Sequence, residues 1–346
     1  MKEKTVVIGM SGGVDSSVAA CLLKDAGYNV IGATMLMLDD EKTKTAIADT
    51  KKICKQIQIP HYIFDVSKEF KELVINCFID SYKEGKTPNP CVVCNKKFKF
   101  GLFYQKAQEL NANYIATGHY AKIENNHLVM SEVKEKDQSY FLCQIEKEVL
   151  PHILFPLNKY KSKDEIRALA RKYQLPVSEK KDSQEICFIP NDDYKKFLNS
   201  KNLKCQEGKI ILKENGKVLG THNGLYNYTI GQRKGLNISF KEPLYVIELD
   251  SKTNTVIVGK NEDLFKETLK AENMNYLVDK TAFFNYDLFA KVRSRGSLEK
   301  IKSITEEQDG SLNVTFEKSQ RAITPGQLIV FYNTKNECLG GGYIIK

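Results

Sequence analysis

The chain has 346 residues, of which 42% are hydrophobic and 27% are charged, and its 52 lysines and arginines exceed its 43 aspartates and glutamates by a formal net charge of +9. This length favours two or three domains over a single core, and no run of about 18 apolar residues predicts a membrane span. The first residues form neither a signal peptide nor an anchor, and nine cysteines, an odd number, indicate reduced thiols, so we expect a cytoplasmic protein without a membrane partner.

The first half of the chain alternates strand-like and helix-like segments. Strands are expected at 5–10, 29–38, 61–66 and 114–120, and helices at 16–26, 45–58, 68–83 and 96–110. Such alternation predicts a parallel sheet with helices on both faces.

The pattern changes near residue 200, where short expected strands are separated by Asn-Gly, Lys-Gly and Asp-Ser turns. These strands lie within 208–224, 226–236 and 243–260, and further short strands follow from about residue 267. We therefore expect an α/β fold with an N-terminal nucleotide-binding domain (1–198) and two small β-rich domains (199–266 and 267–346).

Basic residues gather in short clusters, which suits a polyanionic partner because cationic side chains displace condensed counterions from phosphates. The clusters are Lys96, Lys97 and Lys99; Lys159, Lys161 and Lys163; Lys180 and Lys181; and Lys291, Arg293 and Arg295. A solvated basic surface would give the same charge, so composition alone leaves the partner open.

The segment 9–17, GMSGGVDSS, leaves the first expected strand and enters the first expected helix. Its two adjacent glycines permit close backbone approach, and such a turn presents N–H groups to an anion. The segment matches neither G-x-x-x-x-G-K-S/T nor G-x-G-x-x-G, the two common phosphate-binding patterns. Ser-Gly-Gly-Val-Asp-Ser instead resembles the PP-loop of the ATP pyrophosphatases, which split ATP between its α and β phosphates. The resemblance implies ATP binding, with Asp15 helping to hold Mg²⁺.

Three cysteines stand out from the rest. Cys91 and Cys94 follow a Pro-Asn-Pro bend in TPNPCVVCNKKFKF, and Cys94 lies directly before an expected helix that carries three lysines. A cysteine at a helix N-terminus near lysines has a lowered pKa, so we expect a reactive thiolate at Cys94. The alternative for any one of these residues is a small buried hydrophobic side chain. The third is Cys187, in KDSQEICFIP.

Together these segments resemble the bacterial tRNA-specific 2-thiouridylase family. GMSGGVDSS, TPNPxxxCNKxxKF, ATGHYA, KDQSYFL, KDSQEICFIP, YTIGQRKGL and TPGQ occur in the family's order and spacing over essentially the whole chain. The resemblance implies a PP-loop domain, a small central domain and a C-terminal tRNA-binding β-barrel. It implies ATP- and Mg²⁺-dependent 2-thiolation of the wobble uridine in tRNAs for Lys, Glu and Gln, through adenylylation of the C2 oxygen. A cysteine desulfurase or a sulfur-relay protein would supply the sulfur.

The resemblance also implies roles for individual residues. Cys94 matches the nucleophile and Cys187 the persulfide-carrying cysteine, with a disulfide bond between them as the product of transfer. The ATP-binding positions are Gly9, Met10, Ser11, Gly12, Gly13, Val14, Asp15, Ser16, Met35 and Gly118; those facing the target base are Asn89, Pro90 and Cys91; and those contacting tRNA are His119, Lys136, Asp137, Gln138, Arg293, Ser294 and Gln327. At Arg293 and Ser294 the chain lacks the usual Arg-Tyr pair of the family.

Cys91 replaces the aspartate that many family members have. Cys91, Cys94 and Cys187 resemble a three-cysteine subgroup proposed to hold a 4Fe–4S cluster with one open iron site. A closed zinc site would need a fourth ligand, which no motif places. Two other classes stay open: a small-molecule PP-loop ligase, which predicts no dependence on cysteine, and a non-catalytic tRNA-binding or sulfur-carrier protein, which predicts no ATP consumption.

Overall fold

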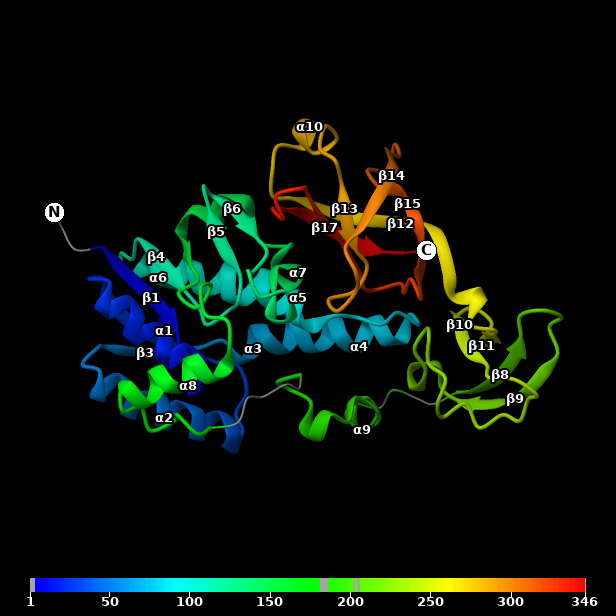
Figure 1. Cartoon of the computed structure of the whole chain (residues 1–346). Helices are drawn as coiled ribbons and strands as arrows, with labels where there is room; N and C mark the ends of the chain where they lie inside the picture. The colour runs from blue at the N-terminus through cyan, green and yellow to red at the C-terminus, as the bar shows by residue number, and fades with distance from the viewer. Residues whose placement is uncertain (1–3, 181–185, 202, 204–205, 346) are drawn as a thin grey trace.

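The computed structural model describes residues 4–180, 186–201, 203 and 206–345. Figure 1 shows an N-terminal α/β part, a small β-rich part near its yellow-green segments and a C-terminal barrel in orange and red. The expected fold class is confirmed. None of the helices in the described ranges combines the length and apolar character that crossing a membrane requires.

A parallel sheet organises the N-terminal part. Its strands, in spatial order, are β3 (His61–Asp65), β2 (Asn29–Leu36), β1 (Thr5–Gly9), β4 (Tyr114–Ala116) and β7 (Ile153–Leu154). Val6, Val7 and Ile8 of β1 are fully buried, because helices cover both faces of the sheet. The strand order changes direction between β1 and β4, and ligands of open α/β sheets bind at the carboxyl edge of such a switch point.

Helices cover the sheet from two sides. Val6 and Ile8 pack in one apolar cluster with residues of α1 (Val14–Asp25), α2 (Glu41–Gln56) and α8 (Lys163–Lys172). Val7 faces a second cluster, shared with α6 (Phe103–Glu109) and α7 (Ser139–Leu142). Further short elements before residue 201 are β5 (Lys122–Glu124), β6 (His127–Val129), η3 (Lys134–Lys136), η4 (Lys147–His152), η5 (Pro190–Asp192) and α9 (Tyr194–Ser200).

Two long helices carry π-helical segments. The first is α3 (Ser67–Phe70), η1 (Lys71–Ile75) and α4 (Asn76–Lys83); the second is α5 (Pro90–Cys94), η2 (Asn95–Leu102) and α6. The second helix begins at Pro90, since proline suits the first helical position, so the expectation that Cys94 precedes a helix is wrong. A Cβ on Gly101 would lie 2.8 Å from the Lys96 carbonyl oxygen, so glycine permits the wide turn of η2.

The two β-rich parts have different topologies. The central sheet runs β10 (Tyr245–Asp250), β11 (Thr255–Gly259), β8 (Glu207–Leu212) and β9 (Val218–Asn223), with η6 (Leu225–Asn227) beside it. The closed barrel runs β12 (Phe265–Tyr276), β15 (Leu312–Arg321), β14 (Glu299–Glu306), β13 (Phe289–Lys291), β16 (Leu328–Tyr332) and β17 (Cys338–Ile344), with η7 (Glu262–Leu264) and α10 (Lys280–Phe283) outside it. The segment 226–236, expected to contain a strand, instead forms the end of η6 and a loop, in which the Gln232 side chain accepts a hydrogen bond from the Thr229 N–H.

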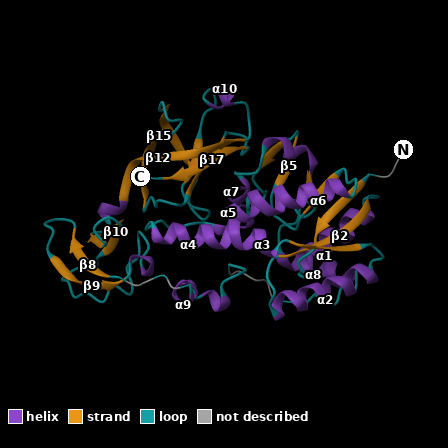
Figure 2. Ribbon diagram, turned by 180° about the vertical axis from the view of Figure 1, so that it is seen from behind, coloured by secondary structure: helices purple, strands orange, loops and turns teal. Residues whose placement is uncertain are grey.

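The segment 85–89, which we call the junction segment, touches both β-rich parts. The Thr87 N–H donates to the Pro325 carbonyl at 3.0 Å, and the Thr87 carbonyl accepts from Gln327 Nε2 at 2.7 Å. A Cβ on Gly85 would lie 3.3 Å from the Cβ of Ser251, just beyond β10. Figures 1 and 2 both show α4 running alongside the barrel toward the central sheet. The junction segment therefore links the parallel-sheet part to the rest of the described chain.

Candidate active site

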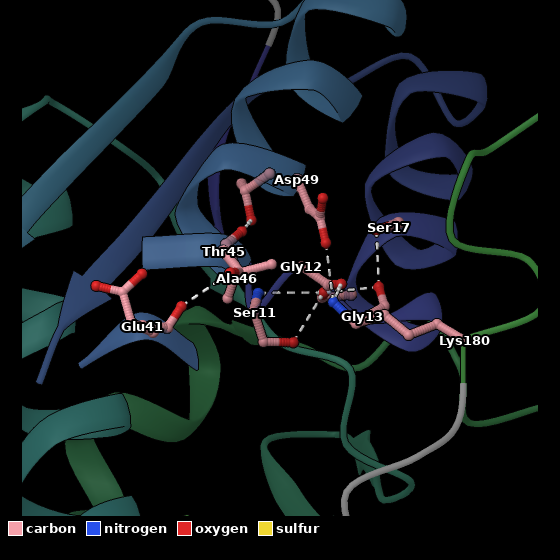
Figure 3. A network of polar contacts seen from close by, with 11 residues as sticks. Ser11, Gly12, Gly13, Ser17, Glu41, Thr45, Ala46, Asp49 and Lys180 are labelled. Carbon is pink, nitrogen blue, oxygen red and sulfur yellow. Dashed lines mark hydrogen bonds and ion pairs between the residues drawn. The ribbon is translucent and has the colours of Figure 1, made fainter. Parts of the chain in front are cut away.

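The segment 9–17, whose sequence resembles a PP-loop and which we call the PP-loop, lies at the switch point of the sheet, between β1 and α1. Gly12 has φ +66°, and a Cβ there would lie 2.7 Å from the Ala46 carbonyl oxygen of α2. The Ser17 hydroxyl donates to the Gly13 carbonyl at 2.7 Å, and the Ser11 N–H donates to the Ser16 hydroxyl at 3.3 Å. Figure 3 shows how tightly the loop lies against α2. The serine hydroxyls thus hold the loop in shape at the positive end of α1.

A second loop, which follows β4, closes on the same place. A Cβ on Gly118 would lie 3.1 Å from the Asp15 Cβ and 3.2 Å from the Ser16 nitrogen, so glycine allows this approach to the first turn of α1. Met35 lies half-buried near the carboxyl end of β2, the neighbour of β1. The residues expected to bind ATP, 9–16 with Met35 and Gly118, are therefore brought to one edge of the sheet.

The Asp15 carboxylate is the charged group of the PP-loop. One oxygen accepts from the Tyr120 hydroxyl at 2.9 Å and forms an ion pair with Lys163 Nζ at 2.8 Å. Among the described residues no group of three or more His, Cys, Asp or Glu side chains is arranged to hold a metal ion. Magnesium bound beside nucleotide phosphates needs only one or two carboxylates, so Asp15 fits that ion as a single protein ligand.

Cys94 is buried rather than exposed at a helix end. It shares an apolar cluster with Phe98 and Phe188, and the residue is 8% exposed. Burial raises the pKa of Cys94 to about 12, while the nearby Lys99 ammonium acts in the opposite direction. The expected lowering of this pKa is therefore wrong, because desolvation of the thiolate outweighs the lysine.

Cys91 and Cys187 lie at the surface near Cys94. Neighbouring protein atoms displace part of their hydration, which raises the pKa of both thiols, and Lys99 opposes this. Repulsion between the thiolates contributes as well, both between Cys91 and Cys187 and between each of them and Cys94. Cys187, which is far from the other two in sequence, therefore lies in one neighbourhood with Cys91 and Cys94. Residues 181–185, the first part of the motif around Cys187, lie outside the described residues.

His119 lies next to the lysine of the cysteine site. Its Nδ1 is 2.8 Å from the Thr117 hydroxyl, and its Nε2 is 3.5 Å from Lys99 Nζ. Burial, followed by repulsion from Lys99, lowers the pKa of His119 well below its ordinary value. The imidazole is therefore neutral at physiological pH, so it would not contact a nucleotide as a cation.

The segment 136–138 is turned largely toward the protein. The Asp137 carboxylate is almost fully buried and accepts hydrogen bonds from the N–H groups of Ser131 and Ser139. Gln138 Oε1 accepts from the Tyr120 N–H at 2.8 Å. Lys136 Nζ is buried 4.9 Å from the centre of the Tyr120 ring and makes no hydrogen bond with any residue of the described ranges.

The expected tRNA contacts in the C-terminal part lie in two places. Arg293 Nη2 donates to the carbonyls of Ile230 and Ala322 and to the Thr324 hydroxyl, so this guanidinium joins the barrel to the central part. Ser294 follows it in a partly buried turn. Gln327 donates a hydrogen bond to the Thr87 carbonyl of the junction segment. Asn89, the first of the residues expected to face the base, follows Thr87 by two residues.

Comparison with known proteins matches three family models in succession along the chain. Residues 4–191 match the model described as tRNA methyl transferase HUP domain, 195–260 the tRNA methyl transferase PRC-barrel domain and 266–344 the aminomethyltransferase beta-barrel domain. The chain is 43% identical over 361 residues to the tRNA-specific 2-thiouridylase MnmA of Caldicellulosiruptor saccharolyticus, with 99% of each chain covered. It belongs to the tRNA-specific 2-thiouridylase family.

Other family members are equally similar along their whole length. The tRNA-specific 2-thiouridylase MnmA 1 of Fusobacterium nucleatum is 46% identical, with 99% of this chain and 93% of the relative covered. The MnmA of Clostridioides difficile is 42% identical, with 99% of each chain covered.

Four residues of this thiouridylase-family site were not singled out as site residues from the sequence. They are Lys99 beside the cysteines, Tyr120 and Lys163 at Asp15, and Lys180, whose Nζ donates to the Gly12 carbonyl at 2.9 Å. The three lysines belong to basic clusters that suggested a polyanion, which was the available signal. Their positions depend on contacts between distant segments, and a single sequence does not reveal those.

Proposed function

We propose that this chain is an ATP-dependent tRNA-uridine 2-sulfurtransferase that converts a wobble uridine to 2-thiouridine, with release of AMP and pyrophosphate. The observation that carries the proposal is the meeting of Cys94 and Cys187 beside Lys99, on a domain whose PP-loop lies at the switch point of its sheet. Family membership supports it, since the relatives are named for this reaction.

The first step activates the base. The C2 oxygen of uridine attacks the α phosphate of ATP, and pyrophosphate leaves. The backbone of residues 9–16 would hold the phosphates at the N-terminus of α1, with Met35 and Gly118 at the adenosine. Mg²⁺, held by Asp15, would neutralise phosphate charge. Adenylylation turns a poor leaving oxygen into AMP.

The second step moves the sulfur. The terminal sulfur of a persulfide on Cys187 attacks C2, and AMP leaves. The Cys94 thiolate then attacks the Cys187 sulfur, which forms a Cys94–Cys187 disulfide and releases 2-thiouridine. Burial disfavours the Cys94 thiolate, and Lys99 is the cation that favours it. Reduction of the disulfide by an external thiol completes the cycle.

The RNA would be bound by all three domains of the chain, 1–198, 199–266 and 267–346. Asn89, Pro90 and Cys91 would face the flipped base, whose removal from the stack costs little in an anticodon loop. The proposed tRNA contacts are His119, Lys136, Asp137, Gln138, Arg293, Ser294 and Gln327. The substrates would be tRNAs for Lys, Glu and Gln, the sulfur would come from a cysteine desulfurase or a sulfur-relay protein, and the enzyme would act in the cytoplasm.

A second candidate keeps the base and changes the sulfur chemistry. Because the thiols of Cys91, Cys94 and Cys187 lie in one neighbourhood, they fit as ligands of a 4Fe–4S cluster better than their sequence separation suggested. Such a cluster would supply a site for hydrosulfide. The geometry of the side chains in the described ranges does not form a metal site as it stands, so cysteine rearrangement would be required.

Thiolation of unmodified tRNA tests the proposal. Purified protein, tRNA, ATP and a persulfide-generating desulfurase should give 2-thiouridine and one AMP for each modified base. Cys94→Ser and Cys187→Ser should each lose activity while retaining tRNA binding. ATP turnover on a small molecule, without dependence on either cysteine, would contradict the proposal and favour a PP-loop ligase.

A further inference from the structure

The PP-loop of this chain carries no cation of its own. Within 9–17 the charged residue is Asp15. In the G-x-x-x-x-G-K-S/T phosphate loop, by contrast, a lysine of the loop itself reaches the phosphates. The pyrophosphate group that leaves ATP carries several negative charges, and stabilising such a leaving group calls for cations fixed near it. The structure brings two lysines to this loop from segments far along the chain.

Lys163 reaches the C-terminal end of the loop, at Asp15. It is the first residue of α8, and its Nζ lies 2.8 Å from Asp15 Oδ1. The side chain is 19% exposed, which is low for a lysine, so its ammonium is held against α1 rather than in solvent. The Tyr120 hydroxyl bonds the same oxygen and fixes the carboxylate from the other side.

Lys180 reaches the N-terminal end of the same turn, at Gly12. Its Nζ donates to the Gly12 carbonyl at 2.9 Å and pairs with Asp49 of α2 at 3.0 Å, as Figure 3 shows. The Gly12 carbonyl is part of the loop itself, so the ammonium lies within one hydrogen bond of the backbone expected to hold phosphate. The two lysines thus stand at the two ends of the Gly12–Asp15 turn.

We propose that Lys163 and Lys180 are phosphate-binding residues that supply, from later segments of the same chain, the positive charge that the PP-loop lacks, and that they contact the β and γ phosphates of ATP. The inference rests on the proposed function, because it takes ATP as the substrate of this loop. Lys163 would exchange its Asp15 partner for phosphate if the carboxylate took up Mg²⁺. Lys180 keeps its hydrogen bond to the Gly12 carbonyl, which holds its ammonium at the loop.

Nucleotide binding by the full-length protein tests this role without relying on thiolation activity. Adenosine 5′-(α,β-methylene)triphosphate, with Mg²⁺, and AMP would be titrated calorimetrically into wild type, Lys163→Met, Lys180→Met and Lys172→Met. Each of the first two substitutions removes a charge-assisted hydrogen bond to phosphate, so triphosphate affinity should fall about tenfold or more, while AMP affinity changes less than about twofold. Lys172, exposed on α8, is the matched control and should change neither.

Asp49→Asn separates ligand binding from support of the loop. If Lys180 only braces the loop through Asp49, this variant should lose triphosphate affinity as Lys180→Met does. In our proposal it keeps the ammonium and stays within about threefold of wild type. The inference would be overturned if the lysine variants lost affinity for the triphosphate and for AMP equally, or if Asp49→Asn lost as much triphosphate affinity as Lys180→Met. In either case, triphosphate binding by the wild type would still uphold the proposed function. A wild-type protein that binds neither nucleotide would refute both.

Discussion

Gly12→Ala should damage the PP-loop in two separable ways. Gly12 has φ +66°, where an L-residue is disfavoured by about 1–2 kcal/mol. In addition, the new Cβ would lie 2.7 Å from the Ala46 carbonyl oxygen, so the loop or α2 must shift by several tenths of an ångström. Forcing an extra carbon into a packed site costs about 1–3 kcal/mol more. The total expected loss in the free energy of unfolding is therefore about 2–5 kcal/mol.

Gly27→Ala is the matched control for this prediction. Gly27 ends α1 with φ +82°, and a Cβ there would meet nothing within 4 Å, so the expected loss is the backbone part alone, about 1–2 kcal/mol. Urea titration of both variants, followed by circular dichroism, gives the difference between them. A calorimetric titration with an ATP analogue should show at least about tenfold weaker binding for Gly12→Ala, since the loop N–H groups move, and unchanged binding for Gly27→Ala. Equal stability and equal nucleotide affinity in the two variants would refute the packing argument.

Three further outcomes are expected. Asp15→Ala should abolish tRNA-dependent pyrophosphate release and leave tRNA affinity nearly unchanged, because phosphates and tRNA use separate surfaces; release at the wild-type rate would disprove the ATP assignment. The tRNA affinity should fall steeply and linearly with salt on logarithmic axes, as counterion release requires, and a flat dependence in filter binding would contradict nucleic-acid binding through the basic clusters. Anaerobically prepared Cys91→Ala should keep most thiolation activity in the persulfide mechanism but lose both iron and activity in the cluster mechanism, with Cys91→Asp as the control that restores the commoner family residue.

Periodic patterns in the sequence predicted the architecture well where they were local. The strand 5–10 was recognisable because Val6, Val7 and Ile8 form a buried run, and the structure has β1 there. The start of the second long helix was missed by six residues, because the Pro-Asn-Pro bend resembles a loop and its last proline in fact occupies the first helical turn.

The candidate site shows the same limit more sharply. The PP-loop residues are contiguous, so their motif located them together. The pKa of Cys94 was predicted in the wrong direction because it depends on burial against Phe98 and Phe188, and Phe188 comes from another segment. The partners of Lys163 and Lys180 likewise depend on how α8 and the following turn pack against α1 and α2. Such contacts join distant segments of the chain, so local sequence patterns do not predict them.

The junction segment bears on how this protein could be recombined with its relatives. Thr87 is bonded to barrel residues on both its N–H and its carbonyl, and Cys94 follows seven residues later in the chain. Tyr140, on the parallel-sheet side, also donates its hydroxyl to the Leu328 carbonyl of the barrel. A chimaera that exchanges the barrel alone would therefore have to rebuild the contacts that position the cysteine-bearing helix. Exchange of residues 85–94 together with the barrel should preserve function better, because these two distant stretches contact each other and would be replaced together.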